Sequence, residues 1–219
     1  MKRTPPQQLP LRFERTRGGR RDGAGRPREQ TRVPHRARPA HRARLPLHVT
    51  LRAHGGLPTF RHEGLVNVIQ RAIGQTSLAW FRVVHFSIQS NHVHLIVEAD
   101  DKMSLSRGMQ SLSARIARGL NRAMSIRGRV WRERYHAREL AYPRSVRNAL
   151  VYVLMNAKKH GEAMTGIDAF SSAPWFDGFV GYAPRDERSP VRVARTWLAA
   201  VGWRQRGLVR LDERPRAPA

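Results

Sequence analysis

The sequence predicts an α+β domain, because strand patterns of period two and apolar stripes of helical period follow one another along the chain. Residues 83–99, VVHFSIQSNHVHLIVEA, read as two strands joined by a short polar connection, which is typical of a β-hairpin. Residues 47–51 alternate apolar and polar side chains as a further strand. Residues 65–73 and 105–120 repeat apolar side chains at helical spacing.

The composition favours a polyanionic partner. The chain has 219 residues, enough for one domain with tails, and 40% of them are hydrophobic, so a core is available. It carries 41 Lys and Arg against 16 Asp and Glu, for a net charge of +25. Nucleic acid is the expected partner, and an acidic membrane surface is the competing explanation.

Two absences in the sequence narrow the function classes. There is no signal pattern at the start and no apolar run of about 18 residues, so we expect a cytoplasmic protein without a membrane partner. There is also no cysteine, which excludes disulfides and thiolate chemistry. Any metal must therefore be held by histidine, carboxylate or amide groups.

The two ends of the chain differ in composition from its middle. Residues 1–43 are rich in Arg, Pro and Gly without apolar periodicity, so we expect a disordered basic arm. Residues 44–161 carry the strand and helix patterns of the predicted domain. Residues 162–219 contain isolated aromatic side chains between Gly, Pro and Arg, and we expect a C-terminal extension that packs a few of them onto the domain.

The predicted helices have start and stop signals. Thr59 is the expected N-cap of the first helix, which should end near Gly74, and Ser104 is the expected N-cap of the second. The third helix should begin at Pro143 and end at Gly161, since Pro favours the first turn and Gly the position after the last.

His92 and His94 are candidate metal ligands. Side chains alternate along a strand, so both imidazoles share one face while Val93, Leu95 and Val97 face the core. Their Cα atoms would lie ~6.6 Å apart, which allows both rings to reach one metal ion. Glu98 would lie ~13 Å along the strand from His94 and is set aside as a ligand. The alternative is a half-exposed polar face without a metal.

Residues 128–140, GRVWRERYHAREL, mix basic and aromatic side chains. This mixture is typical of a surface that stacks bases and contacts phosphates. The alternative is an edge strand whose charges prevent aggregation. The candidate DNA-binding residues in this stretch are Arg129, Arg132, Arg134 and Arg138.

The third helix is expected to present one tyrosine on its polar face. At ~100° per residue, Tyr152 falls opposite the apolar stripe of this helix and beside Asn148, Asn156 and Lys159. The stripe comprises Val146, Leu150, Val153, Leu154 and Ala157. Core packing gives no reason for an aromatic ring at this position.

Three motifs in matching order carry a resemblance to a known family. SNHVHLIVEA, RVWRERYHA and ALVYVLMNAKKHG, within residues 44–161, resemble the HUH single-tyrosine transposases, in particular the REP-associated tyrosine transposases. The chain departs from the family pattern in having Asn156-Ala157 where the family has Asn-Pro.

The resemblance implies a fold, a reaction and site residues. The fold would be a ferredoxin-like antiparallel sheet with helices. The reaction would be metal-dependent cleavage and rejoining of single-stranded or hairpin DNA through a 5′-phosphotyrosine, with Tyr152 as nucleophile. The resemblance assigns His92, His94 and Asn156 to a Mg²⁺ or Mn²⁺ ion.

DNA-binding residues would include Lys158 and Lys159 beside the four arginines. A homodimer is also compatible with the resemblance, because members of the family often act as dimers. The competing function is that of a non-catalytic nucleic-acid binding protein derived from a transposase.

Overall fold

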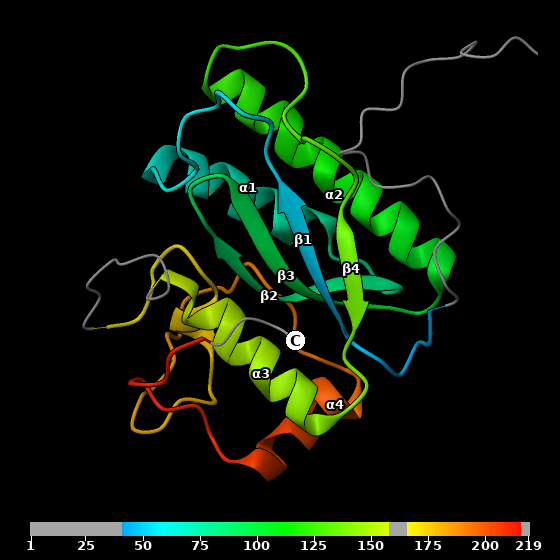
Figure 1. Ribbon diagram of the computed structural model, residues 1–219, viewed down its shortest axis with the longest axis vertical. Helices are drawn as coiled ribbons and strands as arrows, with labels where there is room; N and C mark the ends of the chain where they lie inside the picture. The colour runs from blue at the N-terminus through cyan, green and yellow to red at the C-terminus, as the bar shows by residue number, and fades with distance from the viewer. Residues whose placement is uncertain (1–40, 158–165, 216–219) are drawn as a thin grey trace, which may run out of the picture. The chain divides into compact units, whose positions relative to one another are not determined.

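A four-stranded antiparallel sheet runs through the part of the chain that the computed structural model describes, residues 41–157 and 166–215 (Figure 1). The strands are β1 (Leu47–Arg52), β2 (Phe81–Ile88), β3 (His92–Ala99) and β4 (His136–Glu139). The helices are α1 (Glu63–Thr76), α2 (Lys102–Ala123), α3 (Pro143–Leu154) and α4 (Trp197–Ala200). Two 3-10 helices follow α3, η2 (Ala173–Trp175) and η3 (Gly202–Arg206).

The order of the strands confirms the predicted ferredoxin-like fold. Along the chain the elements run β1, α1, β2, β3, α2, β4, and across the sheet the strands lie in the order β2-β3-β1-β4. The predicted hairpin is β2 and β3, joined by residues 89–91. Each helix crossing returns the chain to the sheet beside a strand that is distant in sequence, so β1 pairs with both β3 and β4.

Alternating side chains give the sheet two different faces. One face is apolar and packs against α1 and α2, with Val49, Val93 and Leu95 fully buried in that core. The other face lies against α3, where Ile96 joins a second cluster of buried residues (Figure 1). Because successive residues of a strand point in opposite directions, both faces are defined by one alternating pattern.

The predicted N-caps of the first two helices are both wrong. Asp101, rather than Ser104, caps α2: its carboxylate accepts a hydrogen bond of 2.6 Å from the Ser104 backbone N–H. α1 begins after His62, whereas Thr59 sits in a preceding turn where its hydroxyl accepts from the Arg61 N–H.

The end of the first helix agrees with expectation, whereas that of the third does not. α1 ends at Thr76, near Gly74 as predicted, and α3 begins at the predicted Pro143 but ends at Leu154, well before Gly161. Within the described ranges, no helix is long and apolar enough to cross a membrane.

The basic stretch 128–140 forms strand only at its end. β4 pairs with β1 alone and is an edge of the sheet, as the edge-strand alternative expected. Upstream, Trp131 forms an isolated bridge to Ala53, and its indole N–H donates to the Ser113 carbonyl. All four candidate arginines of the stretch are exposed.

The C-terminal residues close the face of the sheet that carries α3. As expected, aromatic residues of this segment pack onto the domain: Phe176, Phe179 and Trp203 are buried in one cluster with α3. Contacts place the described residues in one compact unit, Val33–Ala219. The predicted boundary at residue 161 lies outside the described residues.

Glu98 ties this C-terminal segment to β3. Its buried carboxylate accepts hydrogen bonds from the backbone N–H groups of Arg195 and Thr196, and the Arg82 guanidinium lies 3.6 Å away. The Thr196 hydroxyl donates to the same carboxylate. Glu98 therefore has a structural role, which agrees with setting it aside as a metal ligand.

We predict that Glu98→Gln lowers the free energy of unfolding by about 2–4 kcal/mol, because the amide NH₂ faces donors and leaves Arg82 without its counter-charge. Chemical denaturation measures this loss. The same change at the exposed Glu187, which lies 3.9 Å from Arg185, should cost less than about 0.5 kcal/mol. Equal stability of Glu98→Gln and wild type would contradict the role given to Glu98.

Candidate functional site

His92 and His94 lie side by side on the face of β3 that α3 covers. Their ring centroids are 4.6 Å apart with the ring planes nearly perpendicular. His94 is buried and His92 is half-buried, while the intervening Val93 faces the opposite core. The structure thus brings together the two histidines on one face, as strand alternation predicts.

Hydrogen bonds orient the His92 ring. Nδ1 of His92 lies 2.8 Å from Oδ1 of Asn91, and an amide oxygen can only accept, so Nδ1 carries the proton. Nε2 then presents a lone pair. A metal-binding histidine is commonly held in this way, with one nitrogen donating to an oxygen and the other on the metal.

His48 is a third histidine at this site, and the sequence interpretation did not include it. In the register of the sheet, Thr50 of β1 is opposite His94 of β3. The Thr50 hydroxyl lies 3.1 Å from His94 Nδ1, and His48 Nε2 lies 3.3 Å from the same nitrogen. The alternation of His48 and Thr50 with apolar residues was visible in the sequence, but only strand pairing places them beside His94.

Tyr152 of α3 packs against these rings. Its ring centroid lies 5.0 Å from that of His94 and 5.6 Å from that of His48, in edge-to-face arrangements. The side chain is half-buried. The helix therefore docks with the tyrosine over the histidine-bearing strands, which the polar-face argument anticipated.

Asn156 lies beyond the end of α3, contrary to the expectation that the helix continues through it. α3 ends at Leu154, and the Asn156 side-chain amide donates a 3.1 Å hydrogen bond to the Tyr152 carbonyl. That amide takes the acceptor that the backbone N–H would use in a longer helix, a competition typical of asparagine. The expectation that residues 152 and 156 share one face of a continuous helix is wrong.

Asn156 nevertheless offers an oxygen. The residue is fully buried, and its Oδ1 has no hydrogen-bond partner among the described residues. A buried amide oxygen in this state is unusual and suits a ligand or cation. Within the described ranges, no group of three His, Cys, Asp or Glu residues could hold a metal by itself. An amide oxygen is thus the kind of ligand that could complete the histidine pair.

A cationic groove of about 900 Å³ lies beside Tyr152. Its lining includes His48, Tyr152 and five arginines, which are Arg138, Arg144, Arg147, Arg206 and Arg214. The lining also includes the acidic Glu213. It forms a bidentate ion pair with Arg147, with N–O distances of 2.6 and 2.9 Å. The remaining positive charge suits a phosphate backbone.

The predicted DNA-binding residues separate in the structure. Arg138 is opposite His48 in the sheet and lines the groove. Arg129, Arg132 and Arg134 are exposed but do not line it. Lys158 and Lys159 lie outside the described residues. Arg144, Arg147 and Arg206 were not singled out from sequence, since helical position and chain folding decide which arginines face the groove.

Comparison with known proteins identifies the domain. Residues 47–153, from the start of β1 to the penultimate residue of α3, match the family described as IS200-like transposases. This domain belongs to the IS200-like transposase family. The match includes His48, His92, His94 and Tyr152 and stops before Asn156.

The transposase domain is similar to solved structures. One of them is a REP-associated tyrosine transposase bound to a REP hairpin, with 13% sequence identity and a TM-score of 0.46, covering 59% of this chain and 75% of that one. No curated protein sequence matches the chain.

Burial sets the protonation state of His48 in the transposase domain. Desolvation, with a smaller contribution from the Arg138 guanidinium, lowers the pKa of His48 to about 4. The ring is therefore neutral at physiological pH and can exchange a hydrogen bond with His94 without adding charge to the site.

The lowered pKa predicts a loss of stability in acid. The unfolded chain binds a proton at this histidine below about pH 6.5 but the folded chain only below about 4, so the free energy of unfolding should fall as pH drops through this window. The contribution of His48 is up to about 3 kcal/mol. Denaturant unfolding at pH 7, 5.5 and 4.5 measures the slope, which should be shallower for His48→Phe.

The exposed His54 provides the control. His54→Phe should leave the wild-type slope unchanged, because that ring is exposed in the folded chain. A His48→Phe variant that loses stability as steeply as wild type would contradict the burial argument.

Proposed function

We propose that the protein cleaves and rejoins single-stranded DNA through a covalent 5′-phosphotyrosine at Tyr152, with the help of a divalent metal ion. The observation that carries this proposal is the packing of the Tyr152 ring 5.0 Å from His94 and beside His48. A structural tyrosine needs no histidine cluster around it. A nucleophile that attacks a phosphodiester needs groups that accept its proton and neutralise charge.

The donor set fits a hard divalent cation. His92 and His94 would hold it through their imidazoles and Asn156 through its buried Oδ1, a mixed nitrogen and oxygen set that suits Mg²⁺ or Mn²⁺. When bound, such an ion polarises the scissile phosphate and favours the ionised phenol. Thr50 and His48 would hold the His94 ring in place from the side opposite the ligand.

The reaction itself exchanges one ester for another. The Tyr152 phenol oxygen attacks the phosphorus, the bond from phosphorus to the 3′ oxygen breaks, and the phenol proton ends on the departing 3′-OH through solvent or a neighbouring base. One ester is replaced by another, so a second 3′-OH can reverse the step without ATP. Nearby positive charge favours the ionised form of a phenol, and the bound ion would supply that charge.

The groove beside Tyr152 supplies the DNA contacts. Arg138, Arg144 and Arg206 line it and can bind phosphates on either side of the reacting one. The net charge of +25 supports the same partner. Arg129, Arg132 and Arg134, which lie outside the groove lining, would serve the flanking DNA.

Tyr152→Phe should abolish the covalent link to DNA. The substitution removes one oxygen and leaves the ring packing against the histidines, so the fold should survive. Mixed with labelled single-stranded hairpin DNA from the flanks of its own gene and with Mn²⁺, wild type should give a denaturant-stable adduct and the variant at most about a thousandth of it.

Tyr142 is exposed and lines the same groove, so it is the rival nucleophile and the matched control: Tyr142→Phe should retain the adduct. An undiminished yield of adduct from Tyr152→Phe would show that another residue is the nucleophile. Absence of an adduct with all three proteins, together with tight DNA binding, would favour the non-catalytic nucleic-acid binding protein.

The histidine pair should bind Mn²⁺ independently of DNA. Electron paramagnetic resonance of free Mn²⁺ measures binding to the protein alone. We expect the double variant His92→Ala/His94→Ala to lose at least about tenfold in affinity, because two of the proposed ligands are gone. Asn156→Ala should weaken binding less, and the exposed His54→Ala should not change it. Equal Mn²⁺ affinity in wild type and the double variant would overturn the metal site.

A further inference from the structure

β2 and the residue after it carry polar side chains that have no role in the proposed reaction. After a β-bulge near its start, the strand places His85, Ser87 and Gln89 on the face of the sheet that α3 covers, whereas Phe86 and Ile88 lie in the core of α1 and α2. Ser87 and Gln89 are both buried. Buried polar groups need partners, so the contacts of these residues indicate what they do.

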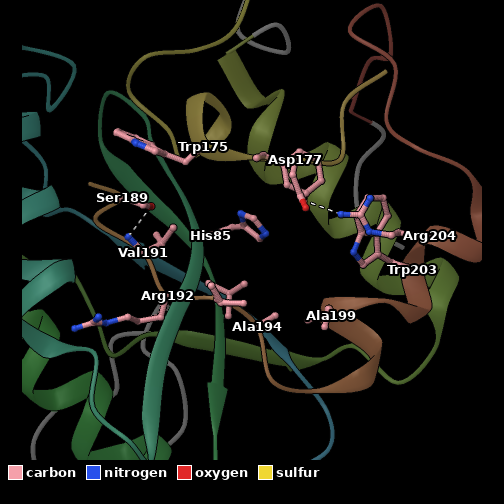
Figure 2. A pocket seen from close by; sticks show the side chains of 14 residues that line it. His85, Trp175, Asp177, Ser189, Val191, Arg192, Ala194, Ala199, Trp203 and Arg204 are labelled. Atoms are coloured by element: carbon pink, nitrogen blue, oxygen red, sulfur yellow. Dashed lines mark hydrogen bonds and ion pairs between the residues drawn. The ribbon is translucent and has the colours of Figure 1, made fainter. Parts of the chain in front are cut away.

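His85 faces the C-terminal segment. Figure 2 shows its ring pointing into a pocket between β2 and that segment, and the ring packs edge-to-face against Phe176. In the register of the sheet, His85 is opposite Ile96. Of the three polar residues, Ser87 and Gln89 are therefore the ones beside the histidine pair.

Gln89 closes the β-hairpin directly beside His92. Its backbone N–H donates to the His92 carbonyl at 2.9 Å, and residues 90–91 connect the two. The ladder pairs Ile88 with Val93, so the next residues along, Gln89 and His92, are also opposite each other and share one face. The Cβ atoms of such a pair lie ~5 Å apart. The Gln89 side chain is thus a neighbour of the proposed metal site.

One hydrogen bond fixes the Gln89 amide. Its Nε2 donates to the Ser87 hydroxyl at 2.7 Å, and Ser87 is opposite His94. The oxygen and nitrogen of an amide point in different directions from their common carbon, so Oε1 is turned away from Ser87. Gln89 is 2% exposed, and the described residues form no hydrogen bond to Oε1. A buried amide normally has both ends paired, so this oxygen is available to a ligand.

Gln89 shares this state with Asn156. The Asn156 Oδ1 is likewise buried and has no partner among the described residues. One of the two amides belongs to the hairpin and the other to the segment that follows α3, which covers the same face of the sheet. Neutral oxygens of this kind are ligands that Mg²⁺ and Mn²⁺ accept beside imidazoles.

The surroundings of His94 favour the β2 side for an ion. On the β1 side, the Thr50 hydroxyl and His48 Nε2 lie 3.1 and 3.3 Å from His94 Nδ1, so Nε2 of the His94 ring is turned away from β1. The exposed Arg52, at the end of β1, adds a positive charge that disfavours a cation there. The β2 side carries the neutral amide of Gln89 instead.

We propose that Oε1 of Gln89 is a further ligand of the divalent metal ion, on the β2 side of His92 and His94. This inference rests on the proposed function, because it assumes that the two histidines hold an ion. Gln89 and Asn156 are neutral, so they add oxygen ligands without cancelling the charge that acts on the phosphate and the phenol. Ser87 is a positioning residue, since it fixes the Gln89 amide.

Two substitutions of opposite effect test this ligand. Gln89→Glu puts a charged oxygen at the same position and should bind Mn²⁺ about tenfold more tightly, whereas Gln89→Met keeps the length without the oxygen and should bind about tenfold more weakly. Electron paramagnetic resonance of free Mn²⁺ measures both, with the full-length protein and no DNA. Gln110→Glu, on the exposed face of α2, is the matched control: it adds the same charge elsewhere and should leave the affinity unchanged.

The opposite signs separate a ligand from a residue that only stabilises the hairpin. Weaker Mn²⁺ binding by both Gln89 variants, or wild-type affinity in both, would overturn the proposal. Thermal unfolding without metal confirms that each variant is folded.

A measurement on the wild-type protein covers the case in which a variant does not fold. Bound Mn²⁺ should broaden the nuclear magnetic resonance signals of the Gln89 side-chain amide beyond detection, because a ligand lies next to the paramagnetic ion, while those of Gln110 stay sharp. A Gln89 amide signal that persists in the Mn²⁺ complex would contradict the ligand assignment.

The outcomes also separate this inference from the proposed function. If wild type binds Mn²⁺ and His92→Ala/His94→Ala does not, while folded Gln89 variants bind like wild type, the Gln89 ligand fails and the metal site stands. If wild type binds no Mn²⁺, both fail.

Discussion

The antiparallel pairing of β1 with β3 is the constraint on which the site depends. In this register Thr50 is opposite His94 on one face, while Leu51 is opposite Val93 and only apolar residues meet on the other face. A shift of one residue would turn every histidine into the core of α1 and α2. The burial of Val49, Leu51, Val93 and Leu95 therefore fixes the histidine cluster as firmly as any contact within it.

The cost of this arrangement is a polar face that must be covered. α3 and the C-terminal segment lie on it, and most polar groups there find partners: Glu98 accepts from the backbone of Arg195 and Thr196, and Ser172 bonds to Phe86. Asn156 Oδ1 stands out because it has no partner among the described residues. α3, which covers this face, also carries Tyr152. The packing of α3 on the sheet therefore also places the tyrosine beside the histidines.

Sequence reasoning succeeded where a signal is local. The alternation of His92 and His94 with apolar residues, the hairpin at residues 89–91 and the start of α3 at Pro143 were all predicted. It failed where two local signals compete. Asp101 and Ser104 are both good capping residues, and the extended backbone at Asp101 decided between them. Asn156 ended a helix that the apolar stripe would have continued, because its side chain took the Tyr152 carbonyl.

By itself, the sequence determined the fold class, the two faces of β3 and the polar position of Tyr152, because side-chain period and residue type act within a few residues of chain. The tertiary structure decided the partners of these groups. It placed His48 and Thr50 against His94, selected Arg138 from four similar arginines, and packed His85 edge-to-face against Phe176. These contacts join residues 44 to 91 positions apart, and only strand pairing and helix docking bring such residues together.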